Sequence, residues 1–507
     1  MTPRTLISVS TALILSLLLT FTAAAETASG GMSDLGVIDF PNAGNAAAQD
    51  PFLTGVKALH SFEFEEAEVA FKAAQEADPS FALAYWGEAM SYNHPLWAQQ
   101  DRDAALQTLA RFAPTPDARA AKTPAGVQRG LMEAIDVLYG DGGDKLVRDI
   151  AYSDAMAKLH SAYPDDDEVA ILYSLSLLGT VRPGDTGFAR QMKAGAIAQQ
   201  VFVRNPNHPG AAHFIIHSFD DPEHAILALP AAEKYAEIAP DAPHALHMPS
   251  HIFVQLGMWD GVVASNIKSY KAAVRHAIRM DLERGRSEFH ALHWYLYGAT
   301  QLGNLEDARW AVDEALRTAA EFPTPQVQRG TMMMVALYML ETERWSEFDL
   351  ADLIAANPKH IGLQFAAGMG AIAAGDLELG RTALANTIAE RMSQEQNPRT
   401  AYMAKIVSVG EKELEAALAL AEGNTSAAAA LLGAAADIEA GLNAPSGPPS
   451  PMKPAFEMYG EFLLDQGRYA EAEEQFKQAL ARTLNRTRSV EGLSKARSAP
   501  ADTAALR

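Results

Sequence analysis

Four histidines occupy matching positions in two copies of one sequence unit, and their spacing is suited to metal binding. The copies read PNHPGAAHFIIHSF from Pro206 and PDAPHALHMPSHIF from Pro240, so the unit recurs after 34 residues. In each copy the histidines stand four residues apart, which places them on one helical face. They are His213 and His217 in the first copy, and His247 and His251 in the second.

Neutral imidazole is a good ligand for Zn, Cu or Ni, and a site needs three or four nitrogens about 2.0–2.1 Å from the ion. Neighbouring helices pack with their axes roughly 8–10 Å apart, so the four rings would face one shared space. We therefore predict one transition metal ion, Zn or Cu, bound by these four histidines. The alternative is that the rings only pack or cap helices, and Pro249 could kink the second helix and spoil the alignment.

Further polar residues near the repeats are candidates for alternate ligands or for groups that orient the ligands. They are His94, His244, His290, His293, Asp220 and Glu288. A carboxylate here could orient an imidazole or act as a base beside a metal-bound water, with helix capping as the alternative. His60, His160, His224, His276 and His360 have no paired neighbour and are expected in ordinary core or surface roles. The chain has no cysteine, GxSxG, HExxH or glycine-rich phosphate loop, so we predict no catalytic residue.

The elements that must position these histidines are helices. From Phe52 onward the apolar residues follow a helical period and β-type alternation is nearly absent, which predicts an all-α fold. We expect Asn207 and Asp241 to cap the two histidine-bearing helices, each with a proline in its first turn. One helix is expected over 82–101 with His94 at its end, a loop over 113–126, and three helices over 127–178.

Small and aromatic residues recur at fixed spacing near both ends of the chain. One set is Gly55, Ala67, Phe71, Ala74 and Pro79; a second is Phe456, Tyr459, Gly460, Ala472, Phe476 and Ala479; a third is Gly303, Ala308 and Ala315. These sets resemble the tetratricopeptide repeat (TPR) family. The resemblance implies an α-solenoid of antiparallel helix pairs, wound as a right-handed superhelix, with a concave groove for a protein or peptide.

In that family the first helix of each pair lines the groove with the residues one, four and eight places after its start. Applied to this chain, the resemblance places eight of the 14 histidines on the inner surface. They are His94, His213, His217, His244, His247, His251, His290 and His293.

The domain organisation follows from these patterns. We predict a signal peptide (1–25), a flexible lead-in (26–51), N-terminal TPR-like helices (52–205), histidine-bearing TPR-like repeats (206–320), degenerate C-terminal helical repeats (321–443), a Pro-rich loop (444–454), a terminal TPR (455–498) and a tail (499–507). The signal has a short positive start, an apolar run and small residues before Glu26. An uncleaved anchor is the alternative.

The composition limits the possible cellular compartments and partner classes. The chain has 507 residues, no cysteine and a formal net charge of −22. We expect an exported protein, in a periplasm or secreted, that does not rely on disulfides. The acidity disfavours nucleic acid and, after signal cleavage, a membrane surface. The oligomeric state stays open.

Three functions fit the sequence. The favoured one is an exported binding or scaffold protein whose histidine-lined groove holds a transition metal. A metal-dependent enzyme with three histidines and a water is the second, and a metal-free protein-interaction adaptor is the third. Whether the chain is an enzyme stays open, with binding favoured because no candidate base is compelling.

Overall fold

The computed structural model describes residues 31–185, 187–397 and 400–498. The predicted signal peptide over 1–25 and the predicted tail over 499–507 lie outside the described residues. The chain divides into two units, residues 1–31 and 32–507, and everything below concerns the second. Among the described residues, no helix is both long enough and apolar enough to cross a bilayer.

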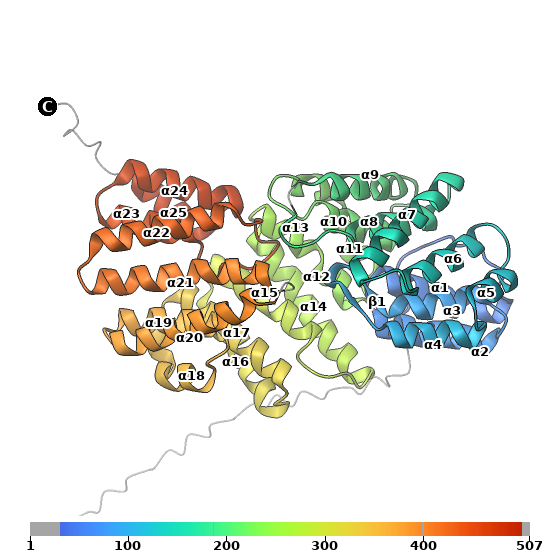
Figure 1. Cartoon of the computed structure of the whole chain (residues 1–507), viewed down its shortest axis with the longest axis horizontal. Helices are drawn as coiled ribbons and strands as arrows, with labels where there is room; N and C mark the ends of the chain where they lie inside the picture. Colours follow the sequence, from blue (N-terminus) through green and yellow to red (C-terminus); the bar gives the residue numbers. More distant parts are fainter. Residues whose placement is uncertain (1–30, 186, 398–399, 499–507) are drawn as a thin grey trace, which may run out of the picture. The chain divides into compact units, whose positions relative to one another are not determined.

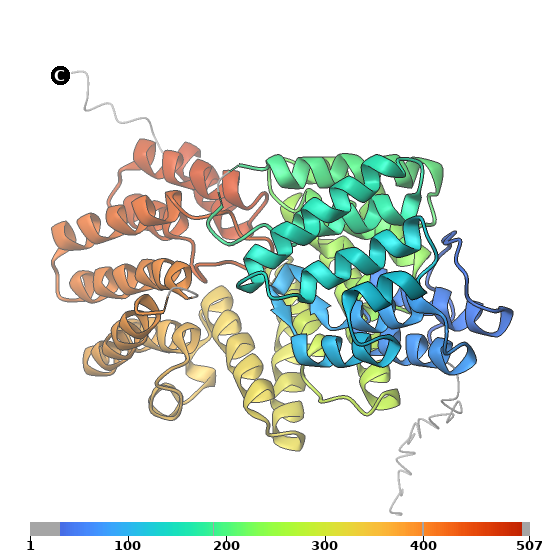
Figure 2. The ribbon, with the colours of Figure 1, turned by 45° about the vertical axis from the view of Figure 1, so that its right-hand side comes forward.

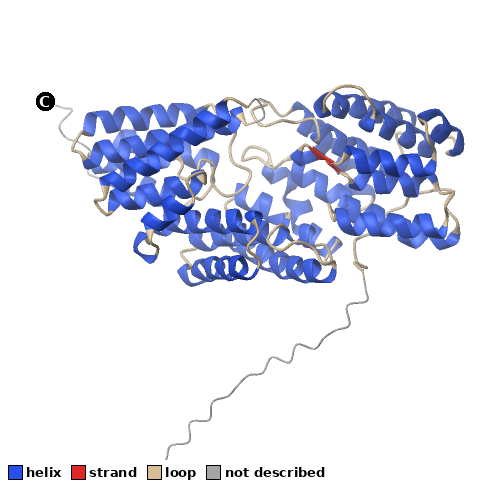
Figure 3. Ribbon diagram, turned by 60° about the horizontal axis from the view of Figure 1, so that its bottom comes forward, coloured by secondary structure: helices blue, strands red, loops and turns tan. Residues whose placement is uncertain are grey.

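The regular secondary structure of the described residues is helical, as predicted, apart from one short hairpin (Figure 3). The first half comprises α1 (Ala46–His60), α2 (Phe64–Ala77), α3 (Ala82–Ser91), β1 (Asn93–His94), η1 (Pro95–Trp97), β2 (Gln99–Gln100), α4 (Arg102–Phe112), α5 (Pro116–Lys122), α6 (Val127–Tyr139), α7 (Lys145–Ala162), α8 (Asp167–Leu178), α9 (Ala189–Arg204), α10 (Pro209–Ser218), η2 (Ala225–Ala228), α11 (Leu229–Ile238), α12 (Pro243–His247) and α13 (Pro249–Gln255). Strands β1 and β2 are antiparallel, with His94 opposite Gln99.

The second half continues as α14 (Trp259–Arg279), α15 (Ser287–Gln301), α16 (Leu305–Glu321), α17 (Pro325–Thr342), η3 (Trp345–Glu347), α18 (Leu350–Ala356), α19 (Ile361–Ala373), α20 (Leu377–Glu395), α21 (Ala401–Ala421), α22 (Thr425–Ala440), α23 (Ala455–Asp465), α24 (Tyr469–Arg482) and α25 (Thr487–Ser498). Most helices pack against the next along the chain, so antiparallel pairs stack in sequence order (Figure 1). Helices α12 to α15 lie between the N-terminal and C-terminal stacks (Figures 1 and 2).

The same packing device holds the first and last repeats together. A Cβ on Gly55 would lie 2.9 Å from the Phe71 ring and a Cβ on Gly87 only 2.2 Å from it, so the ring is wedged between helices α1 and α3. Phe476 is wedged in the same way between Gly460 and Gly492. Close approach of backbones around one aromatic ring is the arrangement that the repeat pattern predicted.

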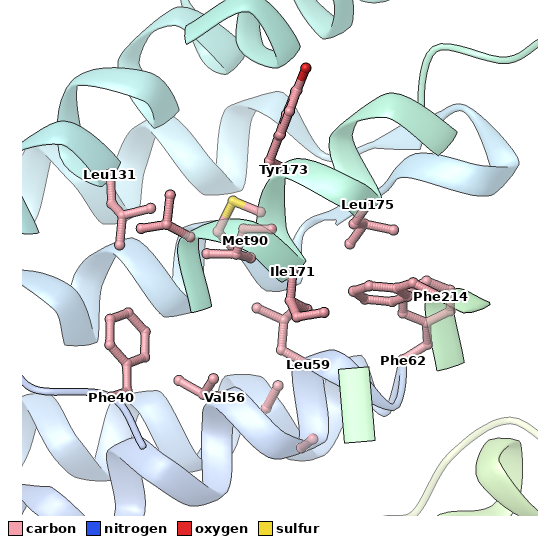
Figure 4. Close-up of a cluster of buried hydrophobic side chains, with 14 of the residues drawn as sticks. Phe40, Val56, Leu59, Phe62, Met90, Leu131, Ile171, Tyr173, Leu175 and Phe214 are labelled. Atoms are coloured by element: carbon pink, nitrogen blue, oxygen red, sulfur yellow. The ribbon is translucent and has the colours of Figure 1, made fainter. Parts of the chain in front are cut away.

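The N-terminal core extends to the helix that carries the first histidines. Apolar side chains of α1, α3, α6, α8 and α10 meet in one buried cluster, in which Phe62 lies beside Phe214 with ring centroids 5.9 Å apart (Figure 4). This packing fixes α10 against α1, which contacts it directly. The position of α10 is therefore set by residues about 150 positions earlier in the chain.

Several local expectations were wrong. Residues 32–45 of the expected flexible lead-in are packed, with Leu35 and Phe40 buried and Val37 N–H donating to the Asn207 carbonyl at 2.9 Å. The helix expected over 82–101 stops at Ser91, because Pro95 cannot continue it and the hairpin β1–β2 follows. Helix α5 lies inside the expected loop over 113–126. The three helices expected over 127–178 are present as α6, α7 and α8.

The predicted N-caps were also misplaced. His208 caps α10 by accepting the Ala211 N–H on its Nδ1, and Ala242 precedes α12. Asp241 instead accepts N–H groups from Ser33 and Asp34, so it holds the lead-in segment. The prolines do stand at the first helical position, where a missing N–H has little cost.

Candidate metal centre

Three of the four histidine-bearing helices begin at prolines. Pro209 opens α10, Pro243 opens α12, and Pro249 opens α13 directly after it. The junction residue Met248 keeps helical dihedrals (φ −53°, ψ −36°). The proline therefore divides the helix without turning His251 away from His247.

Two groups of three histidines lie side by side in this region. Triad A consists of His213, His217 and His244, and triad B consists of His247, His251 and His290. Within each triad, one nitrogen of every ring lies within 4.8 Å of the others. The structure thus divides the four predicted ligands two and two, and each triad is completed by a predicted alternate.

The closest nitrogen pairs have the separation that metal ligands need. His213 Nε2 lies 3.2 Å from His244 Nε2, and His247 Nε2 lies 3.1 Å from His251 Nε2. Two nitrogens bound to one tetrahedral Zn ion are roughly 3.3 Å apart, given the usual Zn–N distance. Two of the three nitrogens in each triad therefore need little rearrangement to share an ion.

The outer nitrogens of three ligand rings are held by acceptors. His213 Nδ1–H donates to the His60 carbonyl at 2.6 Å, His247 Nδ1–H to Asn266 Oδ1 at 2.6 Å, and His251 Nδ1–H to Asp220 Oδ2 at 2.7 Å. The Asn266 amide is itself oriented, because its Nδ2 donates to the Val262 carbonyl at 2.8 Å. Such contacts fix the tautomer and direct the Nε2 lone pair inward, as in metal-ligating histidines.

Burial keeps these imidazoles neutral, which is the form that binds metals. It lowers the pKa of His213 to about 3. Burial, followed by the neighbouring imidazoles, also holds the pKa values of His217, His244 and His247 well below their ordinary range. His217 Nε2 is buried and has no hydrogen-bond partner. A buried nitrogen without a partner needs an explanation, and a bound cation would supply one.

A third cluster is hydrogen-bonded internally and supports triad A. His60 Nε2–H donates to Glu168 Oε2 at 2.7 Å, and His208 Nε2–H donates to Glu168 Oε1 at 3.1 Å. Both protons face a carboxylate, so this group serves as a buried hydrogen-bond network. It fixes His60, whose carbonyl orients His213. Gly210 is needed beside it, because a Cβ there would lie 2.8 Å from His60 Nδ1.

Aromatic rings close the sides of both triads. The Phe62 ring lies 4.3 Å from His213, on a backbone held in the left-handed region (φ 56°). The buried Trp294 packs against His247 and His251, with ring centroids 4.9 and 4.4 Å away. Gly447 of the Pro-rich loop approaches the outer edge of Trp294. These rings exclude water from the sides of the site.

One side of the site opens into a pocket of about 420 Å³. His244 of triad A and His247 and His290 of triad B line it, and His290 is exposed. Aromatic side chains of Phe62, Phe64, His94 and Trp97 also line the pocket, and charged residues including Glu63, Glu283 and Arg286 complete the lining. Both triads are thus accessible from the same space.

The other predicted residues have different surroundings. His94 stacks on Phe64 with ring centroids 4.0 Å apart. Neither His94 nor His293, which lies on α15, belongs to a triad. Asp220 orients His251. Asp221 instead accepts from the Glu223 backbone N–H, in the turn after α10, and from His224 Nδ1. Glu288 binds Arg284 Nε at 2.5 Å and the Gly285 N–H at 2.8 Å, so it organises the start of α15.

Sequence reasoning missed two groups that orient the ligands. Asn266 stands on α14 with no motif around it, and the His60 carbonyl belongs to the end of α1. No local pattern signals either group, because both reach the site only through packing between helices far apart in the sequence.

No family model matches the sequence, and no curated protein matches it. Solved structures that resemble it include yeast Tom70, at 13% identity and a TM-score of 0.35 over 89% of this chain and 95% of that one. Human IFIT1 with m7Gppp-AAAA gives 12% identity and a TM-score of 0.38 over 90% of each chain. Cut9 in its complex with Hcn1 gives 12% identity and a TM-score of 0.36 over 92% of this chain and 79% of that one.

The fold is TPR-like. This description rests on the stacked antiparallel helix pairs and on the wedged Phe71 and Phe476 of the two ends. The TPR-like chain carries its six triad histidines on α10, α12, α13 and α15, at the middle of the stack.

Proposed function

We propose that this chain is a metal-binding TPR-like protein whose groove histidines hold a borderline divalent transition metal such as Zn or Cu. The observation that carries the proposal is the His247–His251 pair. Both Nδ1 atoms donate to acceptors, so both inward nitrogens present lone pairs at 3.1 Å. Two such lone pairs repel unless a cation lies between them.

A shared proton is the competing cation, and the surroundings favour a metal over it. A proton would satisfy one pair, whereas a third imidazole converges on each pair and His217 Nε2 is left without a partner. Three nitrogen donors and no thiolate suit Zn, Cu or Ni rather than Mg or Ca.

Metal analysis tests the proposal. Untagged protein purified without chelators is expected to contain bound Zn or Cu, and chelator-stripped protein is expected to take up Zn(II) with a rise in melting temperature. A free Zn(II) concentration of 100 times the Kd would stabilise the folded protein by about 2.7 kcal/mol. His213→Ala with His247→Ala should abolish this rise and leave the stripped protein's melting temperature less affected. Protein that contains no metal and takes up no Zn(II) overturns the proposal.

The pocket favours a second function at the same site. Three histidine ligands leave a coordination position free, and the pocket gives that position access to a small molecule. We therefore propose that the bound metal meets a small-molecule ligand or substrate there. A change in the Co(II) absorption spectrum on adding azide supports this function; a spectrum that azide leaves unchanged counts against it.

The compartment and the macromolecular partner belong to the same proposal. We propose export to a periplasm or the exterior, on the strength of the N-terminal signal pattern and the absence of cysteine. A protein or peptide is the proposed macromolecular partner of the groove, as the TPR resemblance implies. Fractionation of the native host tests the first point: retention in the cytosol would contradict it.

A further inference from the structure

We infer that the groove binds two metal ions, one in each triad, rather than one ion shared by four histidines. The inference rests on the proposed metal-binding function and makes it more specific. The ions expected are borderline divalent transition metals, because imidazole nitrogens are good ligands for them.

The first support is the partition of the donors. The short nitrogen–nitrogen contacts run within the triads, 3.2 Å between His213 and His244 and 3.1 Å between His247 and His251. One ion takes four protein nitrogens at most in a tetrahedral site, and six converge here. A single four-histidine site would leave two half-buried or exposed imidazoles without a role.

The second support is that the rings cannot regroup freely. His213 is held by the His60 carbonyl, His247 by Asn266 and His251 by Asp220. Moving any of these rings toward the other triad breaks a hydrogen bond that orients it. Each triad therefore keeps its own point of convergence, with one pre-oriented ring in triad A and two in triad B.

The third support is the position of the two points. The triads are adjacent, since the His217 and His251 rings lie 5.7 Å apart and the His244 and His247 rings 6.1 Å apart. Rings of both triads line the same pocket. Two ions so placed could act together on one ligand, which is how paired metal sites work in many hydrolytic and transfer enzymes.

Charge favours loading with two cations. An imidazole ligand brings no negative charge, so two dications would meet without direct compensation from their ligands. Asp220 contacts His251, and Glu65 and Glu283 line the pocket. The whole chain carries a net charge of −22. These carboxylates offset the repulsion between the ions.

Co(II) titration of the chelator-stripped, untagged chain tests the inference. We expect two Co(II) per chain by calorimetry and absorption. His244→Ala removes one ligand of triad A, and His290→Ala removes one of triad B; each is expected to reduce the stoichiometry to one, and the double variant to zero. His293→Ala, on the same helix as His290, and His94→Ala, in the same pocket, are matched controls that should keep two.

The outcomes separate the two proposals. A stoichiometry of one for the unaltered chain overturns the two-ion inference and leaves the proposed function standing, whereas zero overturns both. Because His290 is exposed, its replacement is not expected to affect folding. If His244→Ala does not fold, Cu(II) EPR of the unaltered chain decides: a spectrum broadened by dipolar coupling supports two neighbouring ions, and an isolated-Cu(II) spectrum at saturation overturns them.

Discussion

His247 and His251 turn their Nε2 atoms toward each other at 3.1 Å while their Nδ1 atoms donate outward, to Asn266 and Asp220. The outward acceptors decide the chemistry of the inward side. A carboxylate and an oriented amide oxygen can only accept here, so each ring must place its proton on Nδ1. The pair is therefore preset as two electron-pair donors one helical turn apart.

The first prediction concerns Asp220. Asp220→Asn keeps an acceptor near His251 but loses the negative charge of the group that accepts from His251 Nδ1–H. Loss of such an outer contact typically lowers metal affinity about 10–100-fold. We expect that loss at triad B, measured by competition of Zn(II) between the protein and a chromophoric chelator.

The neighbouring residue provides the control. Asp221 binds His224 Nδ1 and two backbone N–H groups, and none of these partners is a triad residue. Asp221→Asn should leave Zn(II) affinity unchanged. Equal losses in the two variants would mean that the carboxylates act through the local backbone and not through the imidazole.

The second prediction concerns Glu168 and acid stability. Burial alone would raise its pKa, but His60 and His208 outweigh burial and lower the pKa of Glu168 to about 2 from 4.5. A folded-state pKa below the unfolded one stabilises the protein above pH 4.5, and the contribution is lost as the pH falls toward 2. A shift of this size corresponds to about 3 kcal/mol.

Glu168→Gln should therefore lower the unfolding free energy of the stripped protein by about 3 kcal/mol at pH 7. Chemical denaturation at a series of pH values measures it. The difference in unfolding free energy between the variant and the unaltered chain should shrink as the pH falls from 4.5 toward 2, because Glu168 itself becomes protonated. The other buried groups titrate in both proteins and do not affect this difference. Exposed Glu233→Gln is the control and should show no gap. A gap that does not depend on pH would assign the loss to packing.

The third prediction concerns the wedged Phe71. A Cβ on Gly87 would lie 2.2 Å from that ring, whereas a Cβ on Gly433 would have its nearest neighbour at 3.9 Å. Gly87→Ala should destabilise the protein by about 1–3 kcal/mol through overpacking. Gly433→Ala, also inside a helix, should stabilise it by about 0.5–1 kcal/mol through helix propensity. Thermal unfolding followed by circular dichroism measures both, and the two substitutions must change Tm in opposite directions.

The sequence alone was sufficient to predict the structural features that recur along the chain. The offset from Pro206 to Pro240 placed His213, His217, His247 and His251 near one another, and the glycine–aromatic spacing predicted the stacked helix pairs. Both follow from periodic constraints on neighbouring helices. The all-α prediction is confirmed, and metal binding stays a prediction.

The grouping into triads could not be predicted, because it depends on how the helix pairs curve around one another. His290 joins His247 and His251 through contact between α12 and α15, and Asn266 reaches the site from α14. The lead-in was misjudged for a related reason. Leu35 and Phe40 stand in a stretch without helical period, and they pack as single anchors rather than as one face of an element.

The last prediction concerns Arg486, which ties the C-terminal repeat to the histidine-bearing helices. Its guanidinium is buried and pairs with Glu341 at 2.9 Å and with Glu457 at 2.8 Å, and it contacts the Tyr297 hydroxyl at 3.3 Å. The next residue, Thr487, donates its hydroxyl to the Gln301 carbonyl at 2.6 Å. The turn before α25 is therefore anchored on α15, the helix that carries His290.

Arg486→Met would leave the buried Glu341 without its cation and Glu457 with Lys453 alone, at 3.1 Å; removing one partner of a buried ion pair typically costs about 3–5 kcal/mol. Adding Glu341→Gln and Glu457→Gln removes the negative charges that faced Arg486. The triple variant should therefore recover much of the lost unfolding free energy. Exposed Arg468, paired with Glu471 on α24, is the control, and Arg468→Met should change stability little. Urea denaturation measures all three variants. A triple variant as unstable as Arg486→Met alone would show that Arg486 stabilises the turn by packing and not by charge.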